Sequence, residues 1–256
     1  MRVEQLADGI TLYNADCREV LPTLGKVDAV VTDPVWPNVP AGLIAGSDRP
    51  FELFAEFCAA IPAGVRRLAI EMRNDSDPRF LSCIPGRFEF IQVMWCQYAM
   101  PGYLGRVLGG NETVYVYGTP IVSQEGRRVI PSVSPKAQPS DRPPNGHPCS
   151  RALVHQEFVV KWCSDEGEVI LDSFAGSGTT GVAAVKLGRK FIGIEIEPKY
   201  FDIACRRISE ALKQPDLFIE APKPAKQEAF DYDGQDDFRK SLAAGGPGWI
   251  PKEAAE

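Results

Sequence analysis

Short apolar runs alternate with helical segments along most of the chain. Runs rich in β-branched and aliphatic residues, as expected of strands buried on both faces of a sheet, are VDAVVTD, RRLAIEM, EVILDSF and KFIGIEI. ITLYNAD, FEFIQVMWCQYAM and ETVYVYG are predicted as further strands. Helices are predicted for CREVLPTL, FELFAEFCAAI, ALVHQEFVVKWC, residues 179–187 and PKYFDIACRRISEALK. This alternation predicts an α/β fold with a doubly wound, mostly parallel sheet.

One long segment interrupts the alternation. Residues 119–148 are rich in Pro, Ser and Arg and lack periodicity. Loops of this length in a compact domain are usually functional or disordered, and both alternatives stay open here. We therefore expect one domain over residues 1–212, with 119–148 as an insertion, followed by a polar tail over 213–256.

Composition narrows the class of protein. The chain has 256 residues, of which 44% are hydrophobic and 24% charged, so it can bury a sizeable core. No apolar run approaches the length of a membrane span, and MRVEQLADGI lacks the apolar core of a signal peptide. Seven cysteines without paired spacing favour a reducing compartment, so we expect a cytoplasmic protein. With two histidines and no C-x-x-C, we expect no metal site.

A glycine-rich turn lies between a predicted strand and a predicted helix. In DSFAGSGTTGVAA, Gly176, Gly178 and Gly181 satisfy G-x-G-x-x-G. Such a turn lets a ligand approach the backbone and directs amide N–H groups at an anion. Glu195 ends the next strand, where an acid can accept hydrogen bonds from ribose hydroxyls. A tight turn without a ligand is the alternative, but strand, helix and acid together favour a nucleoside cofactor.

The residue before this turn distinguishes between cofactors. NAD or FAD would fit the glycines, but a pyrophosphate has no obvious use for the carboxylate of Asp172. S-adenosylmethionine carries an ammonium for Asp172, a carboxylate for the turn amides and a ribose for Glu195. The sequence therefore favours S-adenosylmethionine.

These motifs resemble those of the amino-group DNA methyltransferases. The stretch from DSFAGSGTT to GIEIEP is similar to their DPFAGSGTT and GIEID signature, VVTDPVW to their D-P-P-Y box, and LYNADCREVL to their G-D-C/A segment. The resemblance covers about Ile10 to Ala211. The D-P-P-Y-like box precedes the cofactor box, which is the circularly permuted order of the β group. Three departures are Val35 and Trp36 in the box, Ser173 for a proline, and HPCSRA (147–152) in place of H-P-T-Q-K-P.

The resemblance implies double-stranded DNA as partner, and the family often forms homodimers. It also implies a wider cofactor site. To Asp172 and Glu195 it adds Phe174, Ala175, Gly176, Ser177, Gly178, Thr179 and Asp16. For Asp16 the alternative is a helix N-cap before CREVL, and for Phe174 simple packing.

The box residues suit a base that carries an amino group. The lone pair of an exocyclic amine is delocalised into the ring, so two acceptors must draw it back to nitrogen. Asp33 offers a carboxylate, and the carbonyl of Pro34 offers a rigid backbone acceptor. Trp36, expected to be exposed, offers a face on which a flipped base can stack, unless it covers the core instead. This mechanism requires Asp33 and the 176–178 turn to share one cavity.

Three rival functions stay open. Cys149, next to a proline, could be the nucleophile of a cytosine-C5 methyltransferase. The glycine turn could belong to an NAD-dependent dehydrogenase. The chain could also be a non-catalytic relative that binds nucleic acid. Within the amino-group family, the acid at Asp33 favours adenine N6 over cytosine N4.

Basic residues gather near the interruption. The net charge is −6, but between Glu125 and Arg151 the acids are only Glu125 and Asp141. The basic residues there are Arg127, Arg128, Lys136, Arg142 and Arg151. We therefore predict that residues 119–148 form the element that recognises the DNA target, with phosphate contacts from the Arg and Lys side chains within that segment.

Overall fold

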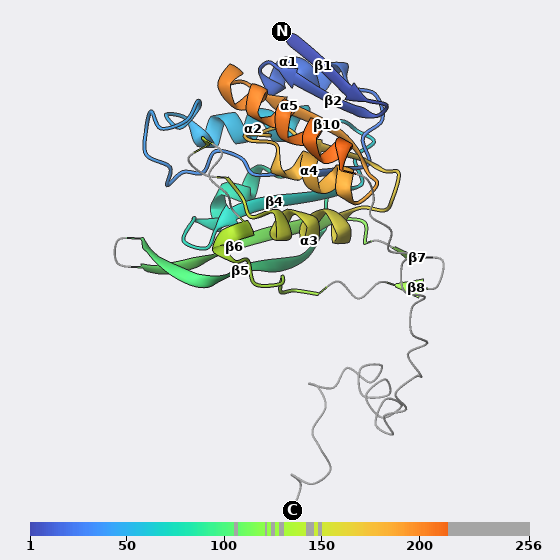
Figure 1. Cartoon of the computed structure of the whole chain (residues 1–256). Coiled ribbons are helices and arrows are strands. Elements are labelled where there is room, and N and C mark those ends of the chain that lie inside the picture. Colours follow the sequence, from blue (N-terminus) through green and yellow to red (C-terminus); the bar gives the residue numbers. More distant parts are fainter. Residues whose placement is uncertain are drawn as a thin grey trace, which may run out of the picture. The chain divides into compact units, whose positions relative to one another are not determined.

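A mixed eight-stranded sheet forms the centre of the molecule (Figure 1). The computed structural model describes residues 1–104, 107–120, 122–123, 126–127, 131–141, 146–147 and 150–214. The strands lie in the order β1-β2-β10-β9-β3-β4-β6-β5. Their bounds are β1 (Arg2–Ala7), β2 (Ile10–Asn14), β3 (Ala29–Thr32), β4 (Arg67–Arg73), β5 (Phe90–Leu104), β6 (Val107–Gly118), β9 (Val169–Asp172) and β10 (Lys190–Glu195).

The centre of this sheet is parallel and its edges are antiparallel. All pairings among β2, β10, β9, β3 and β4 are parallel. β1 pairs antiparallel with β2 at one edge, and β6 joins β4 and β5 antiparallel at the other. The predicted α/β fold is confirmed, and the sheet predicted to be mostly parallel is parallel at its centre and antiparallel at its edges.

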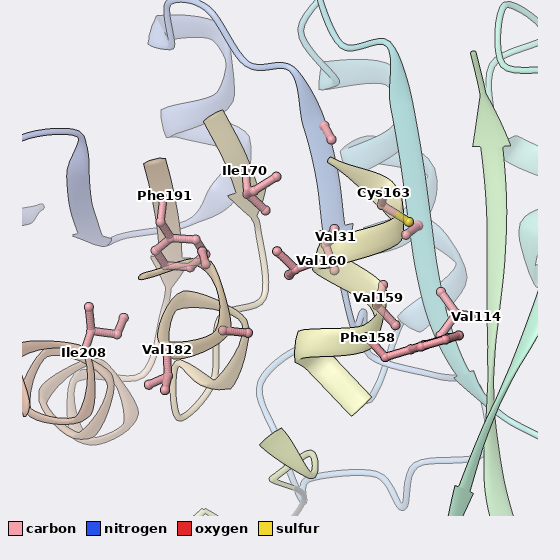
Figure 2. Close-up of a cluster of buried hydrophobic side chains, with 14 of the residues drawn as sticks. Val31, Val114, Phe158, Val159, Val160, Cys163, Ile170, Val182, Phe191 and Ile208 are labelled. Atoms are coloured by element: carbon pink, nitrogen blue, oxygen red, sulfur yellow. The ribbon is translucent and has the colours of Figure 1, made fainter. Parts of the chain in front are cut away.

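Helices cover both faces of the sheet. Their bounds are α1 (Cys17–Val20), α2 (Pro50–Ala60), α3 (Leu153–Cys163), α4 (Thr179–Lys186) and α5 (Pro198–Lys213), with 3-10 turns η1 (Leu21–Thr23), η2 (Pro78–Cys83) and η3 (Pro139–Asp141). Val31 and Ile170 pack with α3, α4 and α5, as Figure 2 shows, whereas Val30 and Leu171 pack in the core with α1 and α2. Successive strand residues point to opposite faces, so one apolar run supplies both cores. None of the described helices is long and apolar enough to cross a bilayer.

The predicted elements match the structure best where the local signal is strong. Helix α5 spans the sixteen predicted residues, beginning with a proline in its first turn. Strand β1 was not predicted, and its mixed pattern of exposed and half-buried residues reflects its place at the sheet edge. The antiparallel pairing of β6 with β4 was not predicted either.

Part of the predicted insertion is attached to the sheet. The described pieces include the two-stranded ladder of β7 (Val122–Ser123) and β8 (Gly126–Arg127). Residues 132–137 run along the outer edge of β5, where Trp95 N donates to Ser132 O at 2.7 Å and Ala137 N donates to Gln97 O at 2.8 Å. The predicted recognition side chains of Arg127, Arg128 and Arg142, the candidate nucleophile Cys149 and the tail from residue 215 onwards lie outside the described part of the structure.

Candidate functional site

A cavity of about 270 Å³ opens at the carboxyl ends of the parallel strands. Strands β3 and β9 are neighbours there, with Val30 opposite Leu171. The next strand after β3, β4, lies on one side of this pair, and the next strand after β9, β10, lies on the other side. Such a reversal point is where α/β sheets usually bind ligands. Asp33 follows β3, and the glycine turn follows β9. Both border this cavity, as the mechanism predicted from the sequence requires.

The structure brings together nearly all of the predicted site residues. The predicted residues that line the cavity are Asp16, Asp33, Pro34, Trp36, Asp172, Phe174, Ala175, Gly176, Ser177, Thr179 and Glu195. Gly178 is the exception. It has a φ of +76° at the start of α4, and a Cβ there would lie 2.8 Å from Ala204 Cβ. Gly178 therefore serves the packing of the turn on α5.

Asp172 is buried at the end of β9 and is held from two directions. Thr32 Oγ1 donates to its Oδ1 at 2.7 Å, and the backbone N of Phe174 donates to the same oxygen at 3.1 Å. Burial raises the pKa of Asp172, while hydrogen bonds from Thr180, Thr32 and the Phe174 amide oppose that shift. A cationic ligand group beside this carboxylate would favour its ionised form.

Glu195 is bonded to the turn itself. Its Oε2 accepts a hydrogen bond from Gly176 N at 2.7 Å, and its Oε1 accepts one from Glu197 N at 2.8 Å. Burial raises the pKa of Glu195 to about 7 despite these two bonds. The carboxyl thus orients the turn and lines the cavity with its remaining lone pairs.

Arg207 on α5 forms hydrogen bonds with the glycine turn. Its Nη1 donates to Ser177 O at 2.6 Å, to Ser177 Oγ at 2.9 Å and to Thr179 Oγ1 at 3.0 Å. Burial lowers the pKa of Arg207. The sequence reasoning did not identify this residue, because nothing in the helical pattern separates it from a surface arginine.

Two of the looser predictions acquire definite structural roles. Asp16 is the N-cap of α1, accepting from Arg18 N at 2.9 Å, and both of its oxygens bond Arg18. Phe174 packs edge-on against Phe57 at 5.6 Å between ring centroids. Asp16 therefore acts as a helix N-cap and Phe174 packs against another aromatic ring, as the alternative interpretations stated. Both residues also line the cavity.

The expectation of an exposed Trp36 is wrong. Only 5% of its surface is exposed, and Nε1 donates to Glu71 O at 3.1 Å. The guanidinium of Arg151 covers its ring, with Cζ 4.4 Å from the ring centroid. An indole buries a large apolar area once its N–H finds an acceptor, which explains why Trp36 turns inward.

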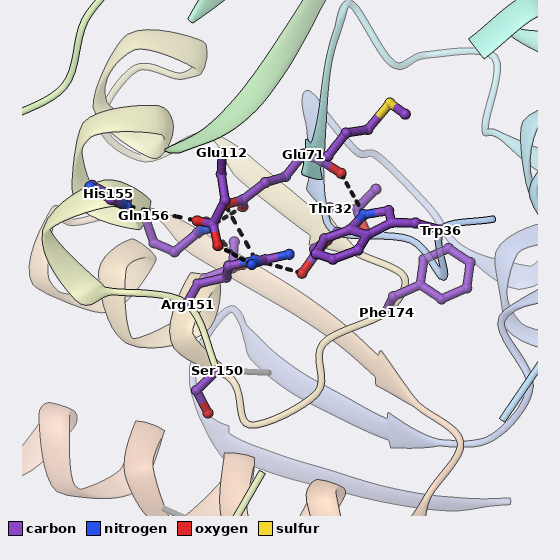
Figure 3. A network of polar contacts seen from close by, with 12 residues as sticks. Thr32, Trp36, Glu71, Glu112, Ser150, Arg151, His155, Gln156 and Phe174 are labelled. Carbon is purple, nitrogen blue, oxygen red and sulfur yellow. Dashed lines mark hydrogen bonds and ion pairs between the residues drawn. The ribbon is translucent and has the colours of Figure 1, made fainter. Parts of the chain in front are cut away.

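Arg151 is the centre of a buried charge cluster that the sequence did not reveal (Figure 3). Its Nε donates to Asp33 Oδ2 at 2.8 Å, and its Nη1 donates to Glu112 Oε1. Glu71 Oε1 lies 3.4 Å from the same Nε, and Gln156 donates to the other oxygen of Glu71. Three carboxylates from three different strands or strand ends thus surround one guanidinium.

This cluster separates the pKa values of its carboxyls. Burial raises the pKa of Asp33 to about 6, with Arg151 opposing the shift, and burial raises the pKa of Glu71 well above its usual range. Burial also disfavours ionisation of Glu112, but Arg151 and a hydrogen bond from Tyr98 hold its pKa at about 2. Within the described part of the chain, no group of His, Cys, Asp and Glu residues is arranged to hold a metal ion.

The sequence contained one signal for Arg151. It stands at the fifth position of HPCSRA, where the similar family segment has lysine. The sequence analysis counted it only among the basic residues near the interruption, and the structure shows that it is buried, with 8% of its surface exposed. Glu71 and Glu112 lie inside strands and carried no motif.

The fold and the site define an α/β protein with a glycine-turn cofactor site facing an Asp-Pro box. A family model described as DNA methylase matches residues 35–206. The chain therefore belongs to the DNA methylase family. This membership decides against the dehydrogenase alternative and confirms the predicted family.

Several curated relatives share a short segment with the chain. The Type II methyltransferase M2.DpnII of Streptococcus pneumoniae is 47% identical over 62 residues, which is 24% of this chain and 23% of that protein. The DNA adenine methyltransferase YhdJ of Escherichia coli (strain K12) is 42% identical over 65 residues, which is 25% of this chain and 22% of that protein. The matched segments thus span about a quarter of these relatives.

Solved structures share the fold over most of the chain. The M1.HpyAVI–SAM complex aligns with a TM-score of 0.59 and 24% identity, covering 77% of this chain and 98% of that one. The cytosine-N4-specific PvuII DNA methyltransferase aligns with a TM-score of 0.55 and 17% identity, covering 82% of this chain and 88% of that one. The predicted methyltransferase-type fold is confirmed.

Proposed function

We propose that the protein transfers a methyl group from S-adenosylmethionine to the exocyclic amino group of a base in double-stranded DNA, with adenine N6 as the target. One observation carries this proposal: Asp33 and the glycine turn border the same cavity. A nucleoside cofactor at the turn and an amino group at Asp33 could therefore meet without an intervening wall. Membership of the DNA methylase family supports the choice of DNA.

The residues around the turn fit this cofactor. Asp172 would take its ammonium group, the turn amides its carboxylate and Glu195 its ribose hydroxyls. Ser173 also lines the cavity, and its buried Oγ has no hydrogen-bond partner among the residues described. When bound, S-adenosylmethionine supplies a methyl group activated by a positively charged sulfur.

The protein's contribution to transfer is to hold and orient the amine. Asp33 and the carbonyl of Pro34 would accept its two N–H bonds and localise the lone pair on nitrogen. Oδ1 of Asp33 is buried and has no hydrogen-bond partner among the described residues. Proximity and orientation then supply much of the rate, and no covalent enzyme nucleophile is required. The methylated ammonium is acidic, so its proton can leave afterwards without a strong base.

Nucleoside analysis tests the function and the target base together. DNA incubated with the protein and tritiated S-adenosylmethionine would be digested to nucleosides and separated. We expect the label in N6-methyl-2′-deoxyadenosine. Label only in N4-methylcytosine would refute the choice of adenine, and label in 5-methylcytosine would favour a nucleophilic role for Cys149. Failure to label any DNA would contradict the proposed activity and favour a non-catalytic binder.

Cofactor binding is expected to weaken as the pH falls from 8 to 6. The pKa of Glu195 is about 7, and its protonation removes an acceptor for the ribose hydroxyls. Linkage predicts a loss of about tenfold in affinity over this interval. Isothermal titration calorimetry at several pH values measures it, and Glu195→Gln should bind weakly without this part of the pH dependence. An equally steep dependence in Glu195→Gln would assign the titration to another group.

The same pKa shift makes an opposite prediction for the free protein. The folded carboxyl keeps its proton at a higher pH than the unfolded one, whose pKa is near 4.5. The contribution of Glu195 to the free energy of unfolding is therefore full below about pH 4.5 and is lost as the pH rises to about 7. Bound cofactor should offset this loss at pH 8.

Replacing both Arg127 and Arg128 with alanine is expected to weaken DNA binding and to reduce its dependence on salt. Each lost phosphate contact should lower the slope of log affinity against log salt by about one. Fluorescence anisotropy with a labelled duplex at several salt concentrations measures both quantities. Unchanged affinity and slope would remove these residues from the DNA interface.

A further inference from the structure

Arg151 contacts Asp33 and Trp36, the two side chains of the box that the sequence analysis expected to meet the target base. Its Nε is 2.8 Å from Asp33 Oδ2, and its planar guanidinium lies against the ring of Trp36. Because Trp36 is only 5% exposed, its ring offers no free surface for a base while Arg151 stays there. A guanidinium and an amino-bearing base edge have the same chemistry at this point, since both are planar and both present N–H donors.

We propose that Arg151 is a specificity-determining residue that occupies the base site in the DNA-free protein and gives up Asp33 only to a base that brings its own amino group. This inference rests on the proposed function. The exchange replaces one N–H donor on Asp33 with another, so the buried carboxylate is never left without a partner.

The structure provides a second position for the guanidinium. Glu71 Oε1 lies 3.4 Å from Arg151 Nε and makes no hydrogen bond within the described part of the chain. Glu112 binds Nη1 and can act as the anchor while Nε turns from Asp33 to Glu71. The charged groups that act on Asp33 or on its arginine partner are Arg151, Glu71, Glu112 and Asp172.

The exchange distinguishes bases by the group at the reacting position. Adenine and cytosine present an amine, which can replace the arginine N–H on Asp33. Guanine and thymine present a carbonyl oxygen at the corresponding position, which would face a carboxylate with no proton between them. A site built around a hydrogen bond to an N–H group rejects the analogue that lacks it far more strongly than a purely apolar pocket does.

The N–H signal of Arg151 tests the exchange directly. The full chain would be labelled with ¹⁵N-arginine, and the Nε–H resonance of Arg151 assigned by its loss in Arg151→Lys. Spectra would then be recorded with sinefungin, a non-reactive cofactor analogue, and a duplex containing the methylation site. The matched control duplex carries hypoxanthine in place of the target adenine, which replaces the amine with a carbonyl and adds a proton at N1.

We expect the Arg151 resonance to move by several line widths with the adenine duplex and to stay in place with the hypoxanthine duplex. An unmoved resonance with a duplex that the same preparation methylates would overturn the inference and leave the proposed function intact. Equal movement with both duplexes would overturn the role in specificity. A wild-type protein that methylates no DNA would contradict the proposed function instead.

Two variants separate this role from a structural one. Arg151→Lys keeps the charge but not the planar donor fork, so the ratio of dissociation constants for the hypoxanthine and adenine duplexes should fall about tenfold. Glu71→Gln replaces the receiving carboxyl group with an amide, and its kcat should fall about tenfold with cofactor affinity unchanged. Glu89→Gln, on an exposed glutamate, is the matched control and should change neither quantity. A wild-type discrimination ratio in a folded Arg151→Lys would contradict the inference.

Discussion

Replacing Asp33 with alanine is expected to reduce methyl transfer by about a thousandfold while leaving cofactor affinity unchanged. The change removes the only side-chain acceptor that the box offers to the amine, so its lone pair stays delocalised in the base. The turn that would hold the cofactor is bonded through Glu195 and Arg207, neither of which contacts Asp33 in the interactions described above. Transfer of tritiated methyl groups to DNA and calorimetric cofactor binding measure the two effects separately.

The stability of the variant distinguishes chemistry from misfolding. Asp33 is one of three carboxylates around one guanidinium, and its pKa is raised to about 6 by burial. Removing it relieves repulsion with Glu71 and Glu112, so the free energy of unfolding at pH 7 should stay the same or rise. Asp33→Asn keeps one oxygen acceptor and should lose less activity than Asp33→Ala. The exposed Asp8→Ala is the control, and equal activity of Asp8→Ala and Asp33→Ala would refute the assigned role.

Replacing Gly178 with alanine is expected to destabilise the fold by about 3 kcal/mol and to weaken cofactor binding. The residue has a φ of +76°, which an L side chain adopts only with strain. Its added Cβ would lie 2.8 Å from Ala204 Cβ and 2.9 Å from Ala204 Cα, and the backbone of α5 cannot withdraw as a flexible side chain could. Urea unfolding measures the loss, and calorimetry measures the effect on the turn.

Gly86 offers a matched control for the same chemical change. A Cβ at Gly86 meets nothing within 4 Å, and the residue has an ordinary φ. Gly86→Ala should therefore leave both stability and cofactor affinity close to the wild-type values. If Gly178→Ala unfolds at the same urea concentration as Gly86→Ala, the close packing of the turn on α5 does not contribute to stability.

The positions of the site residues in the chain could be predicted because each follows a strongly patterned element. The apolar runs of β3 and β9 identify strands, so Asp33 and the turn after Asp172 fall at strand ends. Parallel strands place these ends at one edge of the sheet, which is why a shared cavity was predictable. The glycines of the turn were also informative, because a residue without a Cβ can adopt a positive φ and lets other groups approach its backbone closely.

The contacts of the box could not be predicted in the same way. Trp36 was expected to face a base and is buried under Arg151, a residue 115 positions later in the chain. Arg151 was noted only as a basic residue near the interruption, and it joins carboxylates from β4, β6 and the end of β3. No local pattern marks a charged residue inside a strand as the partner of one far away.

The sequence by itself therefore determined the α/β fold, the order of the motifs and the edge of the sheet where the site lies. It did so because the spacing of apolar residues and the positions of glycines can be read directly from the sequence. Only the tertiary structure decided that Asp33, Glu71 and Glu112 share the single guanidinium of Arg151, and that Trp36 is covered. Those outcomes depend on which side chains the folded sheet brings within hydrogen-bond distance, and burial then forces each charge to find a partner.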